Sequence, residues 1–424
     1  MKWIQLVFIL GLGVSAFGQE AEIRKEYIRE IKKITSDKKV IDAFEYLERT
    51  DEQAVKNLIT LTEIPAPPFG EQARAAKFKE MLSDAGIDSV WIDAEGNVIG
   101  LRKGVVSSRT IVLDAHLDTV FPAETDVTVR YYGDTLKAPG IADDTRGLSM
   151  VIAILSALEY ARIETNDDVL FIGTVGEEGL GDLRGVKHVF SNEDFSIDAW
   201  ISIDGGNIGR ITNAGLGSTR YKAIFKGKGG HSWSAFGLAN PHHALGMAID
   251  KFTLAATEYT NSGSKTSFNV GRIGGGTSVN SIPFESWMEV DMRAIDPGRL
   301  KEIESIFKES MSEGLEEYNA TGVKDPITLE LVKIGDRPSG ELSSGLPLIQ
   351  RAMAATSYFG GNPNLSRGST NSNIPISRGI PAITIGRGGQ GGKAHSLNEW
   401  WMNDEGVKAI QLALLILLSE AGIR

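Results

Sequence analysis

Two polar residues stand where an apolar run of the sequence gives way to a loop. In the stretch IVLDAHLDTV, the residues that follow the run Ile111 to Leu113 include His116 and Asp118. Residues two apart in a strand point to the same side, so this imidazole and this carboxylate share a face. One can bind a metal ion while the other fixes the orientation of the ring. Alone the pair is a weak signal, because a polar strand end at a turn also explains it.

Further His and carboxylate residues stand in loops after other apolar runs. Five residues fit one site for two metal ions: His116, Asp143, Glu178, Asp204 and His395. Asp143 can bridge both ions, which leaves one imidazole and one more carboxylate for each. Two zinc ions about 3.5–4 Å apart activate a bridging water and stabilise the oxygens of a hydrolytic transition state. Nitrogen and oxygen ligands suit zinc, with cobalt or manganese as substitutes.

A second acid stands beside one of these ligands. Glu177 precedes Glu178 in GTVGEEG and points elsewhere. We predict that it is the general base, which takes a proton from the water and passes it to the leaving nitrogen. Paired acids at a strand end are commonly only solvated, and that interpretation stays open for GEEG taken alone.

The elements that must position these residues alternate between strands and helices. Apolar strands are expected at 109–115, in DVLFIGTVGEEG and in DAWISIDGG, with an apolar helix in GLSMVIAILSALEYA. The alternation predicts an α/β fold with a mostly parallel sheet covered by helices. Ligands of such sheets gather beyond the carboxyl ends of the strands, where His116, Glu178 and Asp204 fall. Between 217 and 328, alternating stretches and helices from Pro241 and Pro297 predict an inserted α+β domain.

The length of 424 residues suggests two domains after an N-terminal signal. Residues 1–18 have the layout of a secretory signal peptide, with a basic start, an apolar stretch and small residues near its end. The apolar stretch of roughly 14 residues is short of the roughly 20 that span a bilayer. We therefore expect export to the periplasm or the outside without a stable membrane anchor, an uncleaved anchor being the alternative. The remaining predicted segments are an N-terminal helical segment (19–44), a catalytic domain in two parts (45–216 and 329–424) and the inserted domain (217–328).

Composition excludes several classes of function. The chain has 55 acidic and 44 basic residues, a formal net charge of −11, and no dense basic run. This balance argues against nucleic acid as a partner. There is no Cys, which excludes disulfides, thiolate metal sites and a cysteine nucleophile. Any metal ion must be held by His, Asp and Glu.

The motifs HLDTV, GIADDTRG, GTVGEEG, SIDGG and AHSLNEW resemble, in order and spacing, those of the di-zinc metallopeptidases that include peptidase T, glutamate carboxypeptidase and aminoacylase. The resemblance extends from about residue 55 to 424. It implies that His116 and Asp204 hold one zinc ion, that Glu178 and His395 hold the other, and that Asp143 bridges them. It also implies that Glu177 is the base and that Asp118 orients His116. We expect Asp118 to act only through His116.

The same resemblance makes the inserted domain a lid that forms a homodimer. His231 in GGHS would reach the partner's active site and stabilise the oxyanion, although a simple turn residue is the alternative. Asn280 in VNSIP and Arg293 in VDMRA would bind the carboxylate of the substrate, for which a planar Arg is suited. For Arg293 the alternative is an exposed strand residue. Ser369 to Asn371 depart from the family pattern, which puts local substrate contacts in doubt.

The ligand at position 204 separates branches of this family. Asp here goes with peptidase T and the dipeptidases, so the first hypothesis is an aminopeptidase acting on short peptides. The second is a deacylase or carboxypeptidase acting on N-acyl or N-terminally blocked amino acids, with the same water chemistry. The third is a binding protein without catalysis, which is disfavoured because no ligand and no base is lost.

Overall fold

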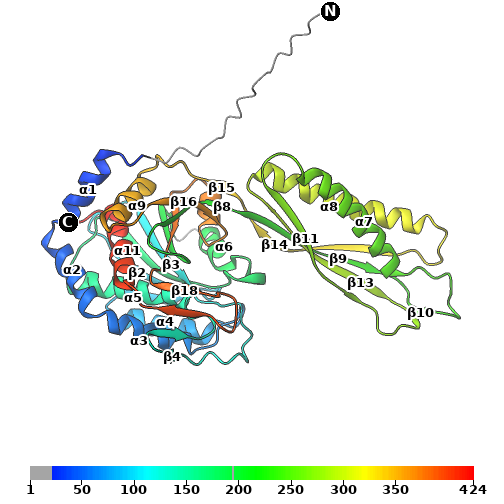
Figure 1. Cartoon of the computed structure of the whole chain (residues 1–424), viewed down its shortest axis with the longest axis horizontal. Coiled ribbons are helices and arrows are strands. Elements are labelled where there is room, and N and C mark those ends of the chain that lie inside the picture. The colour runs from blue at the N-terminus through cyan, green and yellow to red at the C-terminus, as the bar shows by residue number, and fades with distance from the viewer. Residues whose placement is uncertain (1–21, 193–194) are drawn as a thin grey trace, which may run out of the picture.

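The computed structural model describes residues 22–192 and 195–424. The predicted signal peptide, residues 1–18, lies outside the described residues. The chain forms a larger lobe and a smaller lobe, residues 217–337, that extends from one side of it (Figure 1). Among the described residues, no helix has both the length and the apolar character needed to cross a membrane.

A mixed nine-stranded sheet forms the centre of the larger lobe. Its strands are β1 (Ser89–Ile92), β2 (Val98–Arg102), β3 (Thr110–His116), β6 (Asp168–Thr174), β7 (Ala199–Ile203), β8 (Arg210–Gly215), β15 (Gly340–Glu341), β16 (Asn364–Gly368) and β17 (Ala382–Ile385). Their order is β1-β2-β6-β3-β7-β17-β8-β15, with β16 beside β8. The central strands β6, β3, β7 and β17 run parallel. The predicted α/β class with a mostly parallel sheet is therefore confirmed.

Helices cover this sheet in more than one layer. They are α1 (Lys25–Thr35), α2 (Lys38–Arg49), α3 (Asp51–Thr62), α4 (Gln72–Asp84), α5 (Thr145–Tyr160), α6 (Arg184–Ser191), α9 (Pro347–Tyr358), α10 (Asn373–Ser377) and α11 (Gly406–Ala421), with a 3₁₀ turn at Gly179–Gly181. Helix α11 contacts β3 and β7 on one side and α1 and α2 on another. Nearly all of its residues are buried, as expected for a helix that is apolar all round. Helices α1 and α2 thus cover a side of α11 that the sheet does not.

A small second sheet lies beside the site. It consists of β4 (Arg130–Tyr132), β5 (Thr135–Lys137), β18 (Gln390–Gly392) and β19 (Trp400–Met402), in the order β18-β19-β5-β4. Because β5 pairs with β19, the chain just before Asp143 lies against the chain that carries His395.

The smaller lobe is an antiparallel sheet under two helices. It contains β9 (Gly217–Lys226), β10 (Gly230–His231), α7 (Pro241–Thr260), β11 (Thr266–Gly275), β12 (Ser281–Ile282), β13 (Glu285–Ala294), α8 (Pro297–Asn319) and β14 (Thr328–Arg337). The predicted boundary at 328 is wrong, because β14 pairs with β9 as far as Arg337. A register shift between Lys333 and Gly335 interrupts the alternation that would have marked this strand.

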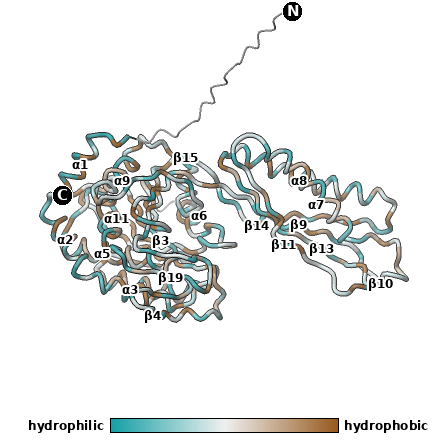
Figure 2. Tube along the Cα trace, in the orientation of Figure 1, coloured by the Kyte–Doolittle hydropathy of each residue, from teal (hydrophilic) through white to brown (hydrophobic). Residues whose placement is uncertain are grey.

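Each lobe has its own hydrophobic core. The cluster around β9, β13, α7 and α8 contains buried residues from Tyr221 to Ile327, and the main cluster of the larger lobe contains none from 217–337. Hydrophobic segments accordingly occur in both lobes (Figure 2).

Candidate metal centre

Three parallel strands end at the same edge of the central sheet and deliver polar residues there. His116 is the last residue of β3, and it is paired with Thr174 at the end of the neighbouring β6. Glu177 and Glu178 follow β6, and Asp204 follows β7. The sequence therefore concentrates ligands at this edge because apolar strands must be buried while their ends reach a loop.

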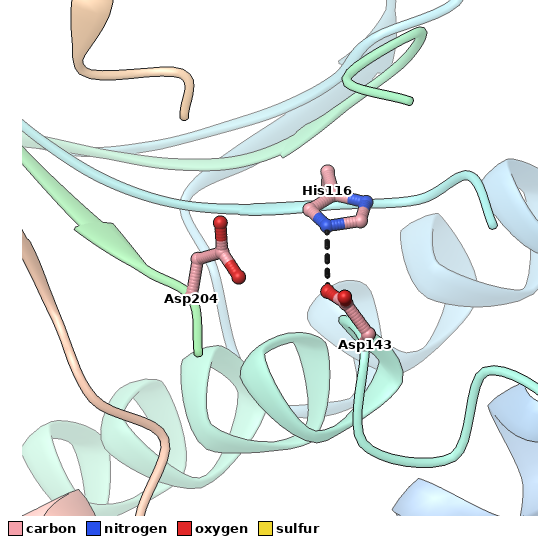
Figure 3. Close-up of side chains that lie close together, drawn as sticks. All are labelled: His116, Asp143 and Asp204. Atoms are coloured by element: carbon pink, nitrogen blue, oxygen red, sulfur yellow. Dashed lines mark ion pairs between the residues drawn. The ribbon is translucent and has the colours of Figure 1, made fainter. Parts of the chain in front are cut away.

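Asp143 lies between the two predicted histidine ligands. Its Oδ1 is 3.4 Å from Nε2 of His116, and its Oδ2 is 3.2 Å from Nε2 of His395. Figure 3 shows the carboxylate beneath the ring of His116, with Asp204 beside it. Glu178 Oε1 is 2.8 Å from the same His395 nitrogen. One carboxylate thus presents a different oxygen to each imidazole, as a residue that bridges two metal ions must.

Among the described residues, three groups of side chains could each hold a metal ion. One is His116, Glu177 and Glu178, and the other two consist only of predicted ligands. The first of these two is His116, Asp143 and Asp204, and the second is Asp143, Glu178 and His395. In each group the ligand atoms lie within 4.8 Å of one another. The structure therefore brings all five predicted ligands together in the two sets that the family resemblance implied, with Asp143 common to both.

The tautomer of His116 fits a metal ligand. Its Nδ1 is 2.9 Å from the main-chain carbonyl oxygen of Asp118 and donates to it. Its Nε2 is buried and has no hydrogen-bond partner among the described residues. In the neutral ring that a metal ion requires, Nε2 carries a lone pair, and a buried lone pair without a donor is costly unless a cation accepts it. With two imidazoles and three carboxylates, the donor set suits a zinc-like ion.

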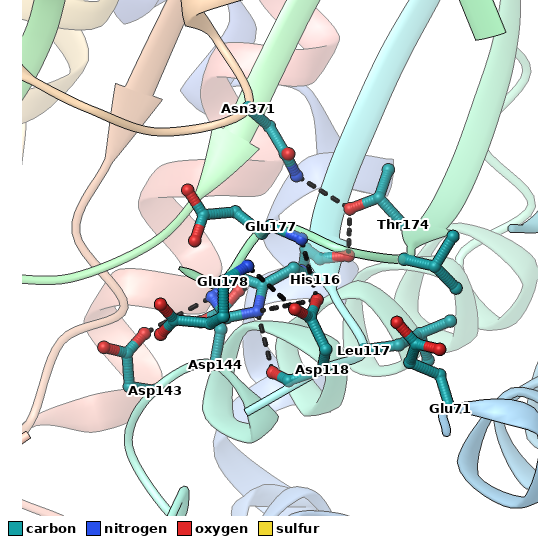
Figure 4. Close-up of polar contacts among 12 residues, drawn as sticks. Glu71, His116, Leu117, Asp118, Asp143, Asp144, Thr174, Glu177, Glu178 and Asn371 are labelled. Carbon is teal, nitrogen blue, oxygen red and sulfur yellow. Dashed lines mark hydrogen bonds and ion pairs between the residues drawn. The ribbon is translucent and has the colours of Figure 1, made fainter. Parts of the chain in front are cut away.

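Asp118 makes contacts beyond the one expected with His116. Its Oδ1 accepts the N–H of Glu177 at 2.9 Å and its Oδ2 accepts the N–H of Glu178 at 2.7 Å, and Figure 4 shows both bonds. The carboxylate is 3.6 Å from His116 Nδ1, farther than the Asp118 carbonyl. The expectation that Asp118 acts only through His116 is wrong. The carboxylate also fixes the main chain that carries the base and a ligand.

The predicted base, Glu177, is buried against an arginine that the sequence analysis missed. Arg337 Nη1 donates to Glu177 Oε1 at 3.1 Å, and both side chains are less than one-tenth exposed. Burial raises the pKa of Glu177 well above its usual range, although the charges of Arg337 and His116 oppose this rise. A carboxylate that readily accepts a proton suits a general base.

A second missed arginine reaches into the metal-ligand cluster. Arg387 follows β17, and its Nη1 is 3.1 Å from Asp143 Oδ1 and 3.7 Å from oxygens of Asp144 and Asp204. Arg387 and the histidines hold the pKa of Asp143 well below its usual range despite burial. Arg387 stands in the Gly-rich stretch GRGGQGG, and the rule that polar residues after strands form the site would also have selected it.

The carboxylates also hold positive charge on the histidines. Contacts with Asp143 and Glu178 raise the pKa of His395 to about 10. Burial lowers the pKa of His116, but Asp118 and Asp143 raise it more, so that it lies well above its usual range. The cluster therefore attracts cations strongly, which is a property of a metal site.

Two further acids position the loop that carries Asp143. Asp144 caps helix α5, accepting the N–H of Gly147 at 3.2 Å, and it also accepts the N–H of His116. Glu399 accepts three main-chain N–H groups, those of Gly140, Ala142 and Asp143. Glu399 was missed, because a single acid in AHSLNEW carries no spacing signal.

Ser369 and Asn371, in the stretch that departs from the family pattern, bind groups in the interior of the protein. Asn371 is buried, and its amide donates to Asp114 at 2.6 Å and to Thr174 at 2.7 Å. Ser369 accepts a hydrogen bond from Arg337 at 3.1 Å. Asn371 thus binds one residue of β3 and one of β6, and Ser369 binds the arginine that holds the base.

His231 and Asn280 lie together but outside this cluster. His231 pairs with Ser281 between β10 and β12, and the N–H of Ser232 donates to the carbonyl of Asn280. Figure 1 places β10 at the end of the smaller lobe farthest from the larger lobe. Within the described part of one chain, neither residue has a hydrogen bond or ion pair with the predicted ligands.

Arg293 lies nearer the junction of the lobes. It stands opposite Ser218 on β9, and its Nε donates to Asp291 at 2.7 Å. Asp291 also accepts from Arg220, whose Nη1 donates to the carbonyl of Gly179 in the loop after Glu178. Arg293 is thus linked to the site through one acid and one further arginine.

Comparisons with known proteins agree with this geometry. The sequence profile described as Peptidase family M20/M25/M40 matches residues 112–419, well over half of the chain. A Bacillus subtilis (strain 168) protein described as uncharacterized protein YqjE is 24% identical over 390 residues, which are 87% of this chain and 98% of that protein.

Solved structures show the same fold. The crystal structure of aminopeptidase PepT from Bacillus cereus ATCC 10987 has a TM-score of 0.69 at 22% identity, covering 88% of this chain and 99% of that one. The Bacillus subtilis YXEP protein, described as a dinuclear metal binding peptidase, has a TM-score of 0.60 at 18% identity, covering 88% and 100% of the two chains.

Proposed function

Because the chain belongs to peptidase family M20/M25/M40, we propose that it is an exported di-zinc aminopeptidase that removes the first residue of short peptides. The observation that carries the proposal is Asp143, whose two oxygens each face one imidazole. Likeness to an aminopeptidase and to a dinuclear metal binding peptidase supports it. The ions are proposed to be zinc, with Co²⁺ or Mn²⁺ as substitutes.

The ligands divide between two positions. His116 and Asp204 would hold one ion, Glu178 and His395 would hold the other, and Asp143 would serve both. When bound, such a pair of ions lowers the pKa of a water molecule and polarises the scissile carbonyl. Arg387, beside Asp143 and Asp204, orients the carboxylates of the first position.

Glu177 moves the proton. Its Oε1 is held by Arg337, which leaves the other oxygen to accept the proton of the attacking water. Glu177 then donates this proton to the nitrogen of the departing peptide. Arg293 is proposed to hold the C-terminal carboxylate of the substrate, which limits the length of peptide that fits.

Two cavities are lined by residues that are near the ligands in the sequence, although no predicted ligand lines either of them. One of about 390 Å³ is lined by residues that include Pro139, Leu397 and Asn398. The other, of about 350 Å³, is lined by residues that include Arg387 and Trp400. Both adjoin loops that carry ligands, and their different linings give a basis for side-chain preference.

We propose that the site is completed by a second copy of the chain. His231 and Asn280 stand at the far end of the smaller lobe, so a homodimer through this lobe is needed for them to meet a substrate. His231 would then donate to the oxyanion of the partner's site, and Asn280 would contact the substrate there. Trp233 and Phe236, close to His231, are each 86% exposed, which agrees with a surface that a partner covers.

The experiment is a substrate panel on the protein purified without residues 1–18 and supplied with zinc or cobalt. Release of free amine from unblocked tripeptides, and little from N-acetyl amino acids, is expected. The Glu177→Gln variant is the control for adventitious peptidase. Turnover of blocked substrates alone would instead favour a deacylase or carboxypeptidase, and no hydrolysis without bound metal would favour a binding protein.

A further inference from the structure

Arg337 contacts the predicted base at two points. Its Nη1 donates to the Glu177 side chain at 3.1 Å, and its Nη2 donates to the main-chain carbonyl of the same residue. Nη1 also donates to Ser369 Oγ at 3.1 Å. Only 6% of the arginine side chain is exposed. Both terminal nitrogens are therefore committed to groups of the protein.

This arginine comes from the junction between the lobes. Arg337 is the last residue of β14 and stands opposite Ser218, near the start of β9. The chain passes from one lobe to the other at this pair of strands. The N–H of Asp336 donates to the carboxylate of Asp182 at 2.9 Å, so the strand contacts the loop after β6 at a second place.

The two contacts of Arg337 restrict the side chain of Glu177. A glutamate side chain has several rotatable bonds, and burial alone does not choose among its rotamers. A planar guanidinium that holds both the carboxylate and the carbonyl of one residue restricts the side chain to one orientation. One oxygen is then occupied, and the other is left for the proton.

We propose that Arg337 is a positioning residue that fixes the Glu177 carboxylate for proton transfer and makes its position depend on the junction of the lobes. This inference rests on the proposed function. Since both terminal nitrogens bind Glu177 and Ser369, Arg337 is not the group that holds the carboxylate of the substrate.

The test compares Arg337→Met and Arg337→Lys with a matched control. Arg109 makes the same two-point contact with Glu420, through the carbonyl at 3.2 Å and through the carboxylate. It precedes β3, at the opposite end of that strand from His116. Arg109→Met removes an equivalent arginine remote from the site, so kcat and KM should match the wild type.

For Arg337→Met we expect kcat to fall about 10²-fold, the size of effect that a small misplacement of a catalytic group produces. KM and metal content should stay at the wild-type values. Arg337→Lys should recover only part of kcat, because an ammonium lacks the planar fork. A crystal structure of the metal-loaded Arg337→Met protein should show the Glu177 carboxylate displaced.

Several results would overturn the proposal. Wild-type kcat in both variants, or an unmoved Glu177, would remove the positioning role. A raised KM for peptides with a free C-terminus, but not for amidated ones, would assign Arg337 to the substrate. Loss of metal would show that it acts through Glu178. If Arg337→Met does not fold, the Lys variant decides. Failure of the proposed function is distinguished from failure of this inference by the wild type. If the proposed function is wrong, the wild type hydrolyses no peptide, whatever the position of Glu177.

Discussion

Replacing Asp118 with Asn tests whether this carboxylate holds the loop of Glu177 and Glu178. Asp118 is fully buried, and each of its oxygens accepts one main-chain N–H of this loop. An amide keeps one acceptor but turns an NH₂ donor toward the other N–H. A hydrogen bond to a charged group contributes about 1.5–3 kcal/mol, and an unsatisfied buried donor costs about 1–3 kcal/mol. We expect the free energy of unfolding to fall by about 2.5–6 kcal/mol, the sum of these two terms.

The assay is urea unfolding of the wild type and of Asp118→Asn, each with zinc and with a chelator. The bonds to Glu177 and Glu178 need no metal ion, so the loss should be of similar size in both conditions. Hydrolysis should fall about 10²-fold, since base and ligand lose their support. A loss of stability confined to the metal-loaded protein would refute this reasoning and restore the view that Asp118 acts only through His116.

Asp93→Asn provides a matched control. Asp93 accepts the N–H groups of Glu95, Gly96 and Asn97 in the turn between β1 and β2. Its replacement should also lower stability with and without metal, for the same physical reason. Because this turn supplies no predicted site residue, metal content and kcat should be retained.

Three further predictions concern the base, the second copy and the metal. Glu177→Gln should abolish hydrolysis yet keep both metal ions by elemental analysis, and loss of metal would mean that base and ligand are exchanged. His231→Ala should lower kcat about 10²–10³-fold without loss of metal. Mixing this variant with Glu177→Gln should restore part of the activity, because a mixed dimer contains one site with both residues. No recovery would argue against a histidine supplied by the partner. Since the pKa of His395 is raised to about 10 in the metal-free protein, its proton must leave before a metal binds. Zinc affinity measured by calorimetry should therefore rise up to about tenfold per pH unit for this proton between pH 6 and 8, and a plateau above pH 7 would contradict the assigned pKa.

The sequence was sufficient for the family, the α/β class and the convergence of five ligands. The reason is that parallel strands end at one edge, so residues far apart in the chain, such as His116 and Asp204, meet when their strands are neighbours. The family resemblance is confirmed by the match over residues 112–419. The roles of the five ligands and of Glu177 stay predictions, although the structure brings these residues together.

What the sequence did not reveal depends on contacts between distant segments. Arg337 is the last residue of a strand and Arg387 follows one. Nothing in the spacing of these two residues predicts that they contact Glu177 and Asp143. The main-chain bonds of Asp118 were equally hidden, because a His-x-Asp pair suggests a side-chain contact. For His231, the pattern suggested a role but only the fold puts it at the far end of the smaller lobe.

The pairing of Ser218 with Arg337 also has an evolutionary meaning. The chain leaves the larger lobe and returns to it at neighbouring positions, and the hydrophobic cores on the two sides are separate. An insertion with this geometry interrupts the gene without interrupting either core. The smaller lobe is therefore exchangeable between proteins as a unit, provided that the incoming lobe also ends in an arginine that holds Glu177 as Arg337 does.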